Sequence, residues 1–138
     1  MRTMMLIALV LISGTSAARA DDPDIDCIRP PNTQAVIWCS GKELRRADDE
    51  LNIIYKKALA YLVKIDKSRA EFGQTDVGVA RSLDDAERAW LKYRDNNCDA
   101  MSAESLGGTA YSAYVFYCQI EMTRTRTKEL KKLIGEND

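Results

Sequence analysis

The stretch that decides the fold is LDDAERAWLKYRDNNC, residues 83–98. It contains neither Pro nor Gly, and its apolar residues recur at helical spacing, at Leu83, Ala86, Trp90 and Tyr93. Trp90, Arg94 and Cys98 follow one another at intervals of four, so they lie along one face of the predicted helix. A large ring, a guanidinium and a thiol on one face are typical of a packed and tethered helix. The rest of the chain must therefore cover this face.

The first twenty residues have the three-part pattern of a secretory signal peptide. Arg2 supplies the positive start, residues 4–12 form an apolar run, and Ala18-Arg19-Ala20 is a small-x-small cleavage site. We expect cleavage after Ala20, and hence a periplasmic or secreted protein. No other stretch is apolar enough to predict a membrane helix.

The chain after this signal peptide (residues 1–20) divides into two parts. Residues 21–31 are acidic and contain all three prolines, and residues 32–138 are expected to form one helical domain. The carboxylates of the first part favour a solvated terminus over a metal cluster. Because the sequence directly before Cys27 is too acidic for lipid attachment, we expect no membrane anchor.

Charge and residue types restrict the possible functions. Removing Arg2 and Arg19 from the 20 basic residues leaves 18 against 21 acidic ones, a net charge of −3, which argues against a nucleic-acid partner. The chain has no His, so an ordinary Ser–His or Cys–His nucleophile is excluded. The adjacent carboxylates of Asp84 and Asp85 point apart on a helix and form no acid–base couple. We therefore expect neither an enzyme nor a cofactor.

An even number of cysteines follows the predicted signal peptide: Cys27, Cys39, Cys98 and Cys118. In an exported chain this count predicts disulfides. Zinc is the competing interpretation, but no pair has the C-x-x-C spacing and His is absent, so we expect no metal. We predict the sequential pairing, Cys27–Cys39 and Cys98–Cys118. A bundle brings the last three cysteines to one end, so proximity alone leaves the other pairings open.

Two long helices flank the stretch at residues 83–98. After Pro31, Asn32 or Thr33 can cap a helix that fades near residues 67–68. Its stripe alternates spacings of three and four: Ile37, Ser40, Leu44, Ala47, Leu51, Ile54, Ala58, Tyr61 and Ile65. Another helix is expected from about Ala110 to Ile134, with this stripe: Phe116, Ile120, Thr123, Thr127, Leu130 and Ile134. Gly41 costs the first helix about 1 kcal/mol relative to Ala, so packing must hold its first turns.

The middle helix is expected to begin at Thr75 or Asp76, after a break at residues 72–75, and to end near Cys98. There is no strand signal of any length, no internal repeat and no linker. The sequence therefore predicts an all-α fold, a three-helix antiparallel bundle stapled by two disulfides.

Several ordered motifs now point to one family. They are A-D-x-x-L-N-x-x-Y at residues 47–55, L-x-x-A-x-x-A-W-x-x-Y-R-x-x-x-C at 83–98, G-G-T at 107–109 and T-x-x-R-x-x-x-L at 123–130. Together with the four cysteines, they cover most of the chain after residue 20. The sequence resembles the LprI-type lysozyme-inhibitor N-terminal domain family of small exported bacterial domains.

The resemblance implies a helical exported domain with lysozyme as a partner. Two features depart from the family pattern. Glu87 stands where we expect Gln. The namesake of the family is a lipoprotein, whereas this chain has no lipid-attachment sequence.

Six residues are candidates for one polar network: Asp48, Asn52, Tyr55, Trp90, Arg94 and Arg126. The first three share a face of the first helix. A catalytic Asp–Tyr–Arg set is one interpretation, but a buried structural network is favoured. Trp90, on the same apolar stripe as Ala86 and Tyr93, is expected in the core rather than in a ligand site.

Register predicts one contact within this network. If the cysteines of the three helices are level at one end, Asp48 lies about 13 Å further along the axis at 1.5 Å per residue. The third helix places Arg126 near that height, whereas Arg94 falls nearer Glu43. We therefore predict an ion pair between Asp48 and Arg126, with Trp90 alongside.

The candidate partner-binding residues lie around the last interhelical loop: Ser102, Ser105, Gly107, Gly108, Thr109, Tyr111 and Tyr114. The loop of residues 101–109 is clamped by Cys98 and Cys118 and is the one protruding element. Its hydroxyls and backbone amides are suited to hydrogen-bonding carboxylates. Residues 111–117 contain more rings than one helix face can bury, and exposed Tyr is a common interface anchor.

These observations favour a binding module, an exported lysozyme inhibitor that acts by occluding the catalytic cleft. Lysozyme-type cleavage needs a protonated and an ionised carboxyl in one cleft, so an inhibitor needs no chemistry of its own. The alternative hypothesis is a structural or adaptor module of the bacterial envelope, which binds another envelope protein without inhibiting lysozyme.

Overall fold

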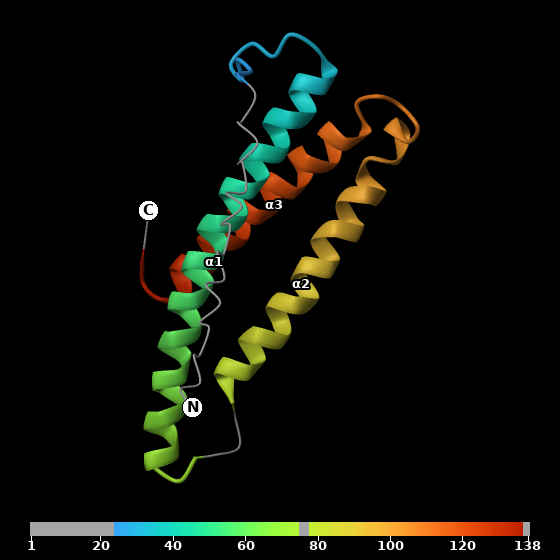
Figure 1. The fold of residues 1–138 in the computed structure, drawn as a ribbon. Coiled ribbons are helices and arrows are strands. Elements are labelled where there is room, and N and C mark those ends of the chain that lie inside the picture. The colour runs from blue at the N-terminus through green and yellow to red at the C-terminus, as the bar shows by residue number, and fades with distance from the viewer. Residues whose placement is uncertain (1–23, 75–77, 137–138) are drawn as a thin grey trace, which may run out of the picture.

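The structure is a computed structural model and describes residues 24–74 and 78–136 (Figure 1). It contains the helices α1 (Thr33–Glu71), α2 (Val79–Met101) and α3 (Tyr111–Leu133), with a short 3-10 helix, η1 (Ala103–Ser105), after α2. In Figure 1 α1 runs down the page, α2 up and α3 down again, so α1 and α3 are parallel and α2 is antiparallel to both. No strand occurs in these described ranges. The predicted all-α fold is confirmed; the predicted signal peptide lies outside the described residues.

Local side-chain chemistry sets the ends of α1. Asn32 is the N-cap, and its Oδ1 accepts a hydrogen bond from the backbone amide of Ala35 at 2.9 Å, as the sequence predicts. At the other end Phe72 caps the helix, and Gly73 adopts a φ of +73°, a conformation that glycine reaches without steric cost.

The start of α2 is fixed by a side chain from α1. The Asp66 carboxylate accepts hydrogen bonds from the backbone amides of Val79 at 2.9 Å and Ala80 at 3.0 Å. A carboxylate at this position also complements the positive end of the helix dipole. The predicted starting residues, Thr75 and Asp76, lie outside the described residues, and the described helix begins at Val79.

The helices α1 and α3 pack in parallel register, with buried positions at the three-and-four spacing of the predicted stripes. These positions are Ser40, Ala47, Leu51, Ile54 and Ala58 on α1, and Ile120, Thr123, Thr127 and Leu130 on α3. Three ion pairs flank them: Glu43–Arg124, Glu50–Lys131 at 3.0 Å and Lys57–Glu136 at 2.9 Å. Arg124 and Lys131 belong to α3, and Glu136 follows its end; each lies 79 or 81 residues after its partner on α1. Such flanking pairs are typical of parallel coiled coils.

Gly41 lies where these two helices approach each other closely. It is buried, and a Cβ at this position would lie 3.3 Å from Cε2 of Phe116 on α3. The helix propensity lost at Gly41 is therefore offset by close packing.

The buried face of α2 differs from the predicted stripe. Ala86 and Tyr93 are exposed, whereas Glu87 and Arg94 are buried. The apolar pattern was misleading because ion pairs allow these two charged side chains to be buried. Trp90 is half-buried and packs against the central cluster of Leu51, Ile54, Ala58, Leu62, Ala80, Leu83 and Leu130. On α1, Leu62 is buried and the predicted Tyr61 is exposed.

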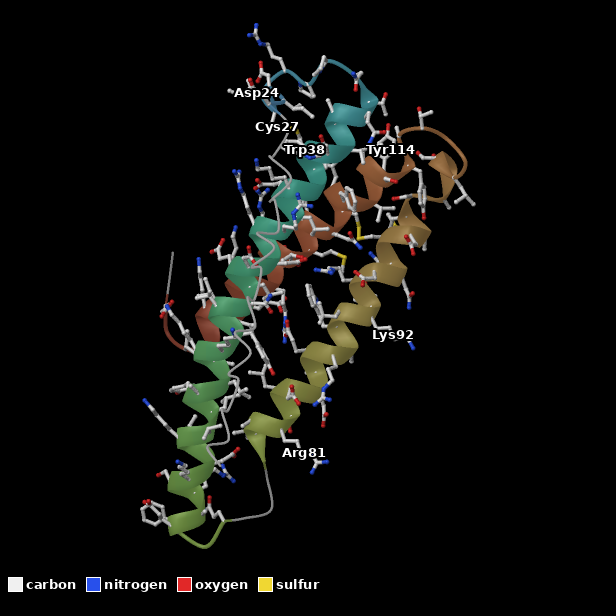
Figure 2. All side chains as sticks on the ribbon, viewed as in Figure 1. Asp24, Cys27, Trp38, Arg81, Lys92 and Tyr114 are labelled. Carbon is white, nitrogen blue, oxygen red and sulfur yellow. A yellow bond between two sulfur atoms is a disulfide. The ribbon has the colours of Figure 1, made fainter. Side chains whose placement is uncertain are left out.

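Both predicted disulfides are present. Cys27–Cys39 joins the N-terminal segment to α1, and Cys98–Cys118 joins α2 to α3, with Cα–Cα distances of 5.6 and 5.5 Å. Figure 2 shows Cys27 at the end of the molecule that also carries the α2–α3 loop. The disulfides thus restrain two segments at one end of the bundle.

Candidate functional site

The base of the α2–α3 loop, residues 102–110, is held by one disulfide and one hydrogen bond. One is the Cys98–Cys118 disulfide. The other is a hydrogen bond from Oη of Tyr111 to Oδ1 of Asp99 at 3.1 Å. Burial and this hydrogen bond to a carboxylate raise the pKa of Tyr111, which therefore stays a neutral donor at physiological pH. The two ends of the loop are thus held together, and we call it the braced loop.

Only some of the hydroxyls and amides predicted to bind a partner are accessible in the loop. Ser102 is buried, so its hydroxyl is not presented to a partner, contrary to the expectation from sequence. Ser105 is half-buried, and its carbonyl accepts the amide hydrogen of Gly108 at 2.9 Å, which occupies that amide. Gly107, Gly108 and Thr109 are exposed, and Gly107 makes the turn with a φ of +79°.

The most exposed apolar side chains of this region were missed from the sequence. Met101 at the end of α2 is 74% exposed, and Leu106 in the loop is 73% exposed. Tyr114, one turn into α3, is 56% exposed, whereas Tyr111 is half-buried. The sequence does indicate them, because Met101 and Leu106 are long apolar residues within an otherwise small and polar segment.

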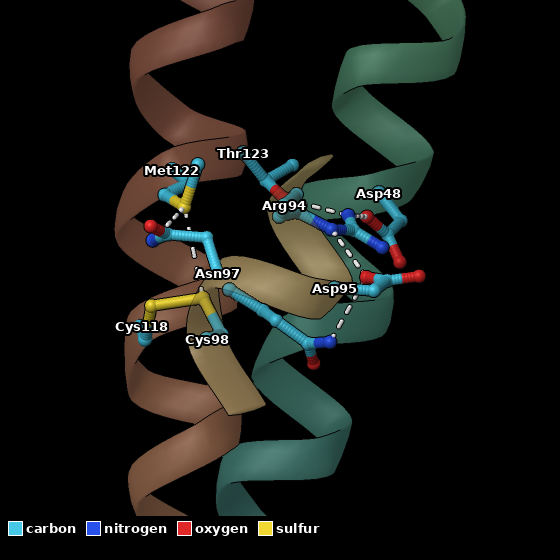
Figure 3. A network of polar contacts seen from close by, with 9 residues as sticks. Asp48, Arg94, Asp95, Asn97, Cys98, Cys118, Met122 and Thr123 are labelled. Atoms are coloured by element: carbon cyan, nitrogen blue, oxygen red, sulfur yellow. Dashed lines mark hydrogen bonds and ion pairs between the residues drawn. A yellow bond between two sulfur atoms is a disulfide. The ribbon is translucent and has the colours of Figure 1, made fainter. Parts of the chain in front are cut away.

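Below the loop, Arg94 connects all three helices (Figure 3). Its side chain is 8% exposed, and its Nη1 donates to Oδ1 of Asp48 on α1 at 2.7 Å and to Oγ1 of Thr123 on α3 at 2.9 Å. Its Nε donates to Oδ1 of Asp95 at 3.0 Å, and Asp95 also accepts from Nε2 of Gln119 at 3.0 Å. A buried guanidinium is tolerated here because carboxylates and a hydroxyl accept its hydrogens.

The predicted ion pair between Asp48 and Arg126 is wrong. Asp48 pairs with Arg94, and Arg126 instead donates from Nε to Oε2 of Glu87 at 3.0 Å. If the cysteines were level, Arg94 would lie beside Glu43, five residues before Asp48. This is an error of about 7 Å along the helix axis.

Trp90 lies between the two pairs. Its ring is 5.5 Å from the guanidinium carbon of Arg94 and 6.0 Å from that of Arg126, within the range of cation–π attraction. Glu87, the departure from the family pattern, supplies the buried carboxylate for Arg126. Arg126 also donates to Glu129 at 2.8 Å. These contacts give Trp90 and both arginines a role in packing.

A groove of about 300 Å³ runs between α1 and α2, lined by Asp48, Leu51, Asn52, Tyr55, Asp84, Glu87, Arg88 and Leu91. Oη of Tyr55 donates to Oδ1 of Asp84 at 2.8 Å, and Arg88 also pairs with Asp84. These two hydrogen bonds lower the pKa of Asp84, the one from Tyr55 contributing most. Burial and the bond to Asp84 raise the pKa of Tyr55. Asn52, predicted within the network, is exposed.

The carboxylates of Asp48, Asp84 and Glu87 hold neighbouring side chains in place. Asp48 accepts from Arg94, Asp84 from Tyr55 and Glu87 from Arg126. Among the described residues, no group of three or more His, Cys, Asp or Glu side chains is placed to hold a metal ion. No helix in the described ranges is long and apolar enough to cross a membrane.

The fold and the site define a small helical protein stapled by two disulfides, with a braced loop at one end. The family described as "Lysozyme inhibitor LprI" matches residues 27–130, and the chain belongs to this family. The uncharacterized protein R02472 of Rhizobium meliloti (strain 1021) is 34% identical over 125 residues, which cover 91% of this chain and 90% of that protein. The uncharacterized protein YecT of Escherichia coli (strain K12) is 25% identical over 122 residues, which cover 86% and 69%. No solved structure matches.

Proposed function

We propose that this protein is exported and inhibits lysozyme by inserting the α2–α3 loop into the catalytic cleft. The observation that carries the proposal is the braced loop with two exposed apolar side chains, Leu106 within it and Met101 at the end of α2 directly before it. The family description supplies the class of partner. The two disulfides support an oxidising location outside the cytoplasm.

The physical basis of inhibition is preorganisation. The Cys98–Cys118 disulfide and the Tyr111–Asp99 hydrogen bond reduce the conformational freedom that the loop would lose on binding. Burial of the exposed apolar side chains of Met101 and Leu106 in a cleft would contribute favourable binding free energy, because it removes them from water. A glycosidase cleft that is filled in this way cannot admit its substrate between its two carboxyl groups.

The test is a lysozyme turbidity assay with the purified protein that begins at residue 21. The wild type should slow the clearing of a bacterial suspension. The double substitution Met101→Ser and Leu106→Ser should raise the inhibition constant about tenfold or more, because two exposed apolar anchors are lost. The matched control is Phe72→Ser, since Phe72 is 79% exposed and follows the far end of α1.

Circular dichroism must show the same helix content in all variants. Equal loss of inhibition in the Phe72→Ser control would refute the loop assignment. A wild-type protein that leaves lysozyme fully active would favour the adaptor alternative. Mass spectrometry of the exported protein should find Asp21 as its first residue, and an uncleaved chain would contradict the predicted signal peptide.

A further inference from the structure

A second hollow lies beside the loop, beneath the N-terminal segment. Its volume is about 730 Å³, and residues of this segment, α1 and α3 line it. Figure 2 shows Asp24, Cys27 and Trp38 gathered at this end of the molecule. The residues that matter below are Ile25, Trp38, Glu43, Arg46, Tyr117 and Arg124. None of these residues belongs to the loop proposed to bind lysozyme.

The hollow has a fixed wall. The Cys27–Cys39 disulfide fastens the N-terminal segment to α1, and both cysteines line the cavity. Within this segment Oδ1 of Asp26 accepts the backbone amide hydrogen of Ile28 at 2.9 Å, which holds a turn. The volume falls within the range of about 300–1,000 Å³ that is usual for small-molecule sites.

Aromatic and aliphatic side chains form part of the lining. The ring of Trp38 is half-buried, and that of Tyr117 is 54% exposed. The face of an aromatic ring carries partial negative charge, so it attracts the weakly positive C–H groups of a flat, saturated ring. Ile25 and Ile120 add aliphatic surface. Such a lining suits a ligand with an apolar ring face.

The charged groups of the lining balance one another. The three cations are Lys42, Arg46 and Arg124, and the three anions are Asp24, Glu43 and Glu121. Arg124 pairs with both Glu43 and Glu121, Arg46 pairs with Glu43, and the Lys42 ammonium lies 4.7 Å from the Trp38 ring centroid. An ionic ligand would have to compete with these pairs, so the hollow favours a neutral one.

The charged side chains of the lining can form hydrogen bonds with the hydroxyls of a ligand. A hydroxyl both donates and accepts, so it can bridge a guanidinium and a neighbouring carboxylate without separating them. The side chains of Arg46, Arg124 and Glu43 are 69%, 49% and 39% exposed, which leaves part of each accessible. A ligand with many hydroxyls and apolar ring faces meets both requirements of the lining.

We propose that this hollow binds a neutral oligosaccharide, for which tri-N-acetylchitotriose serves as the probe. A pyranose ring packs against Trp38 and Tyr117, and its hydroxyls bridge the Arg–Glu pairs. The proposal does not depend on lysozyme binding by the loop.

Isothermal titration calorimetry with tri-N-acetylchitotriose tests the proposal on the protein that begins at residue 21. We expect saturable binding to one site, with an affinity unchanged by added salt because the ligand is neutral. Tyr117→Ala should weaken binding about tenfold through loss of the stacking surface. Tyr114→Ala is the matched control, because Tyr114 lies on the same helix, is 56% exposed and does not line the hollow.

Tryptophan fluorescence supplies a second readout, since the chain has only two tryptophans. The Trp90→Phe variant should keep a ligand-induced change in emission, which then comes from Trp38. The Trp38→Phe variant should show none. No binding at millimolar ligand would overturn the proposal, and so would an equal effect of the two Tyr substitutions. An emission change that persists without Trp38 would place the ligand elsewhere and would also overturn it.

Discussion

Separating Arg94 from Asp48 should reveal how much free energy of unfolding depends on the buried network. The Arg94 side chain is 8% exposed and makes three hydrogen bonds, whereas Asp48 is 37% exposed. Asp48→Asn should cost about 1–2 kcal/mol, because Arg94 keeps Asp95 and Thr123 and because Asp48 is partly screened by solvent. Arg94→Met should cost about 3 kcal/mol, because the buried hydroxyl of Thr123 loses its donor and Asp48 loses its partner.

The assay is urea unfolding of the disulfide-intact protein in a double-mutant cycle. The double variant should be less destabilised than the two single effects combined, with a coupling free energy of about 1–2 kcal/mol. The control cycle uses Lys57→Met and Glu136→Gln, whose side chains are 51% and 46% exposed and whose coupling should stay below about 1 kcal/mol. Additivity of Asp48→Asn with Arg94→Met, within about 0.5 kcal/mol, would refute the pairing and its role in packing.

Three further predictions concern helix packing, the loop base and a carboxylate. Gly41→Leu should lower the free energy of unfolding by about 1–3 kcal/mol through steric conflict with α3, measured by urea unfolding. Replacing Cys98 and Cys118 by Ser should lower it by about 3 kcal/mol, measured against the oxidised wild type. The pKa of Asp84 should lie below its usual value near 3.9 and rise in Tyr55→Phe, measured by NMR titration. The stability that Asp84 contributes is present above its unfolded pKa and is lost as pH falls through its folded pKa.

Features encoded by neighbouring residues could be predicted from the sequence. The Asn32 cap depends on an amide three residues away, and it appears where the sequence places it. The α1 and α3 stripes depend only on helical periodicity, and most of their positions are buried. The pairing of Cys98 with Cys118 joins segments that are close in sequence, on either side of one loop.

Features that depend on the relative height of two helices could not be predicted. The Asp48–Arg126 prediction assumed that the cysteines of the three helices are level, but only Cys98 and Cys118 are joined to each other. A sequence also does not show how far a long Arg side chain extends along its neighbours. In the loop, the residue types predict hydroxyls that are accessible to a partner. The fold instead buries Ser102 and exposes Leu106.

The two buried ion pairs therefore matter for where the loop lies. Helix α2 contributes few apolar residues to the central cluster, and only Ala80 and Leu83 of them are buried. Apolar contacts are non-directional, so a slide of α2 by one turn would replace them at little cost. The same slide would separate Arg94 from Asp48 and Glu87 from Arg126, and each would leave a charge buried without its partner. The pairs thus favour the same register of α2 that the Cys98–Cys118 disulfide and the Asp66 cap hold, and together these contacts position the loop proposed to bind lysozyme.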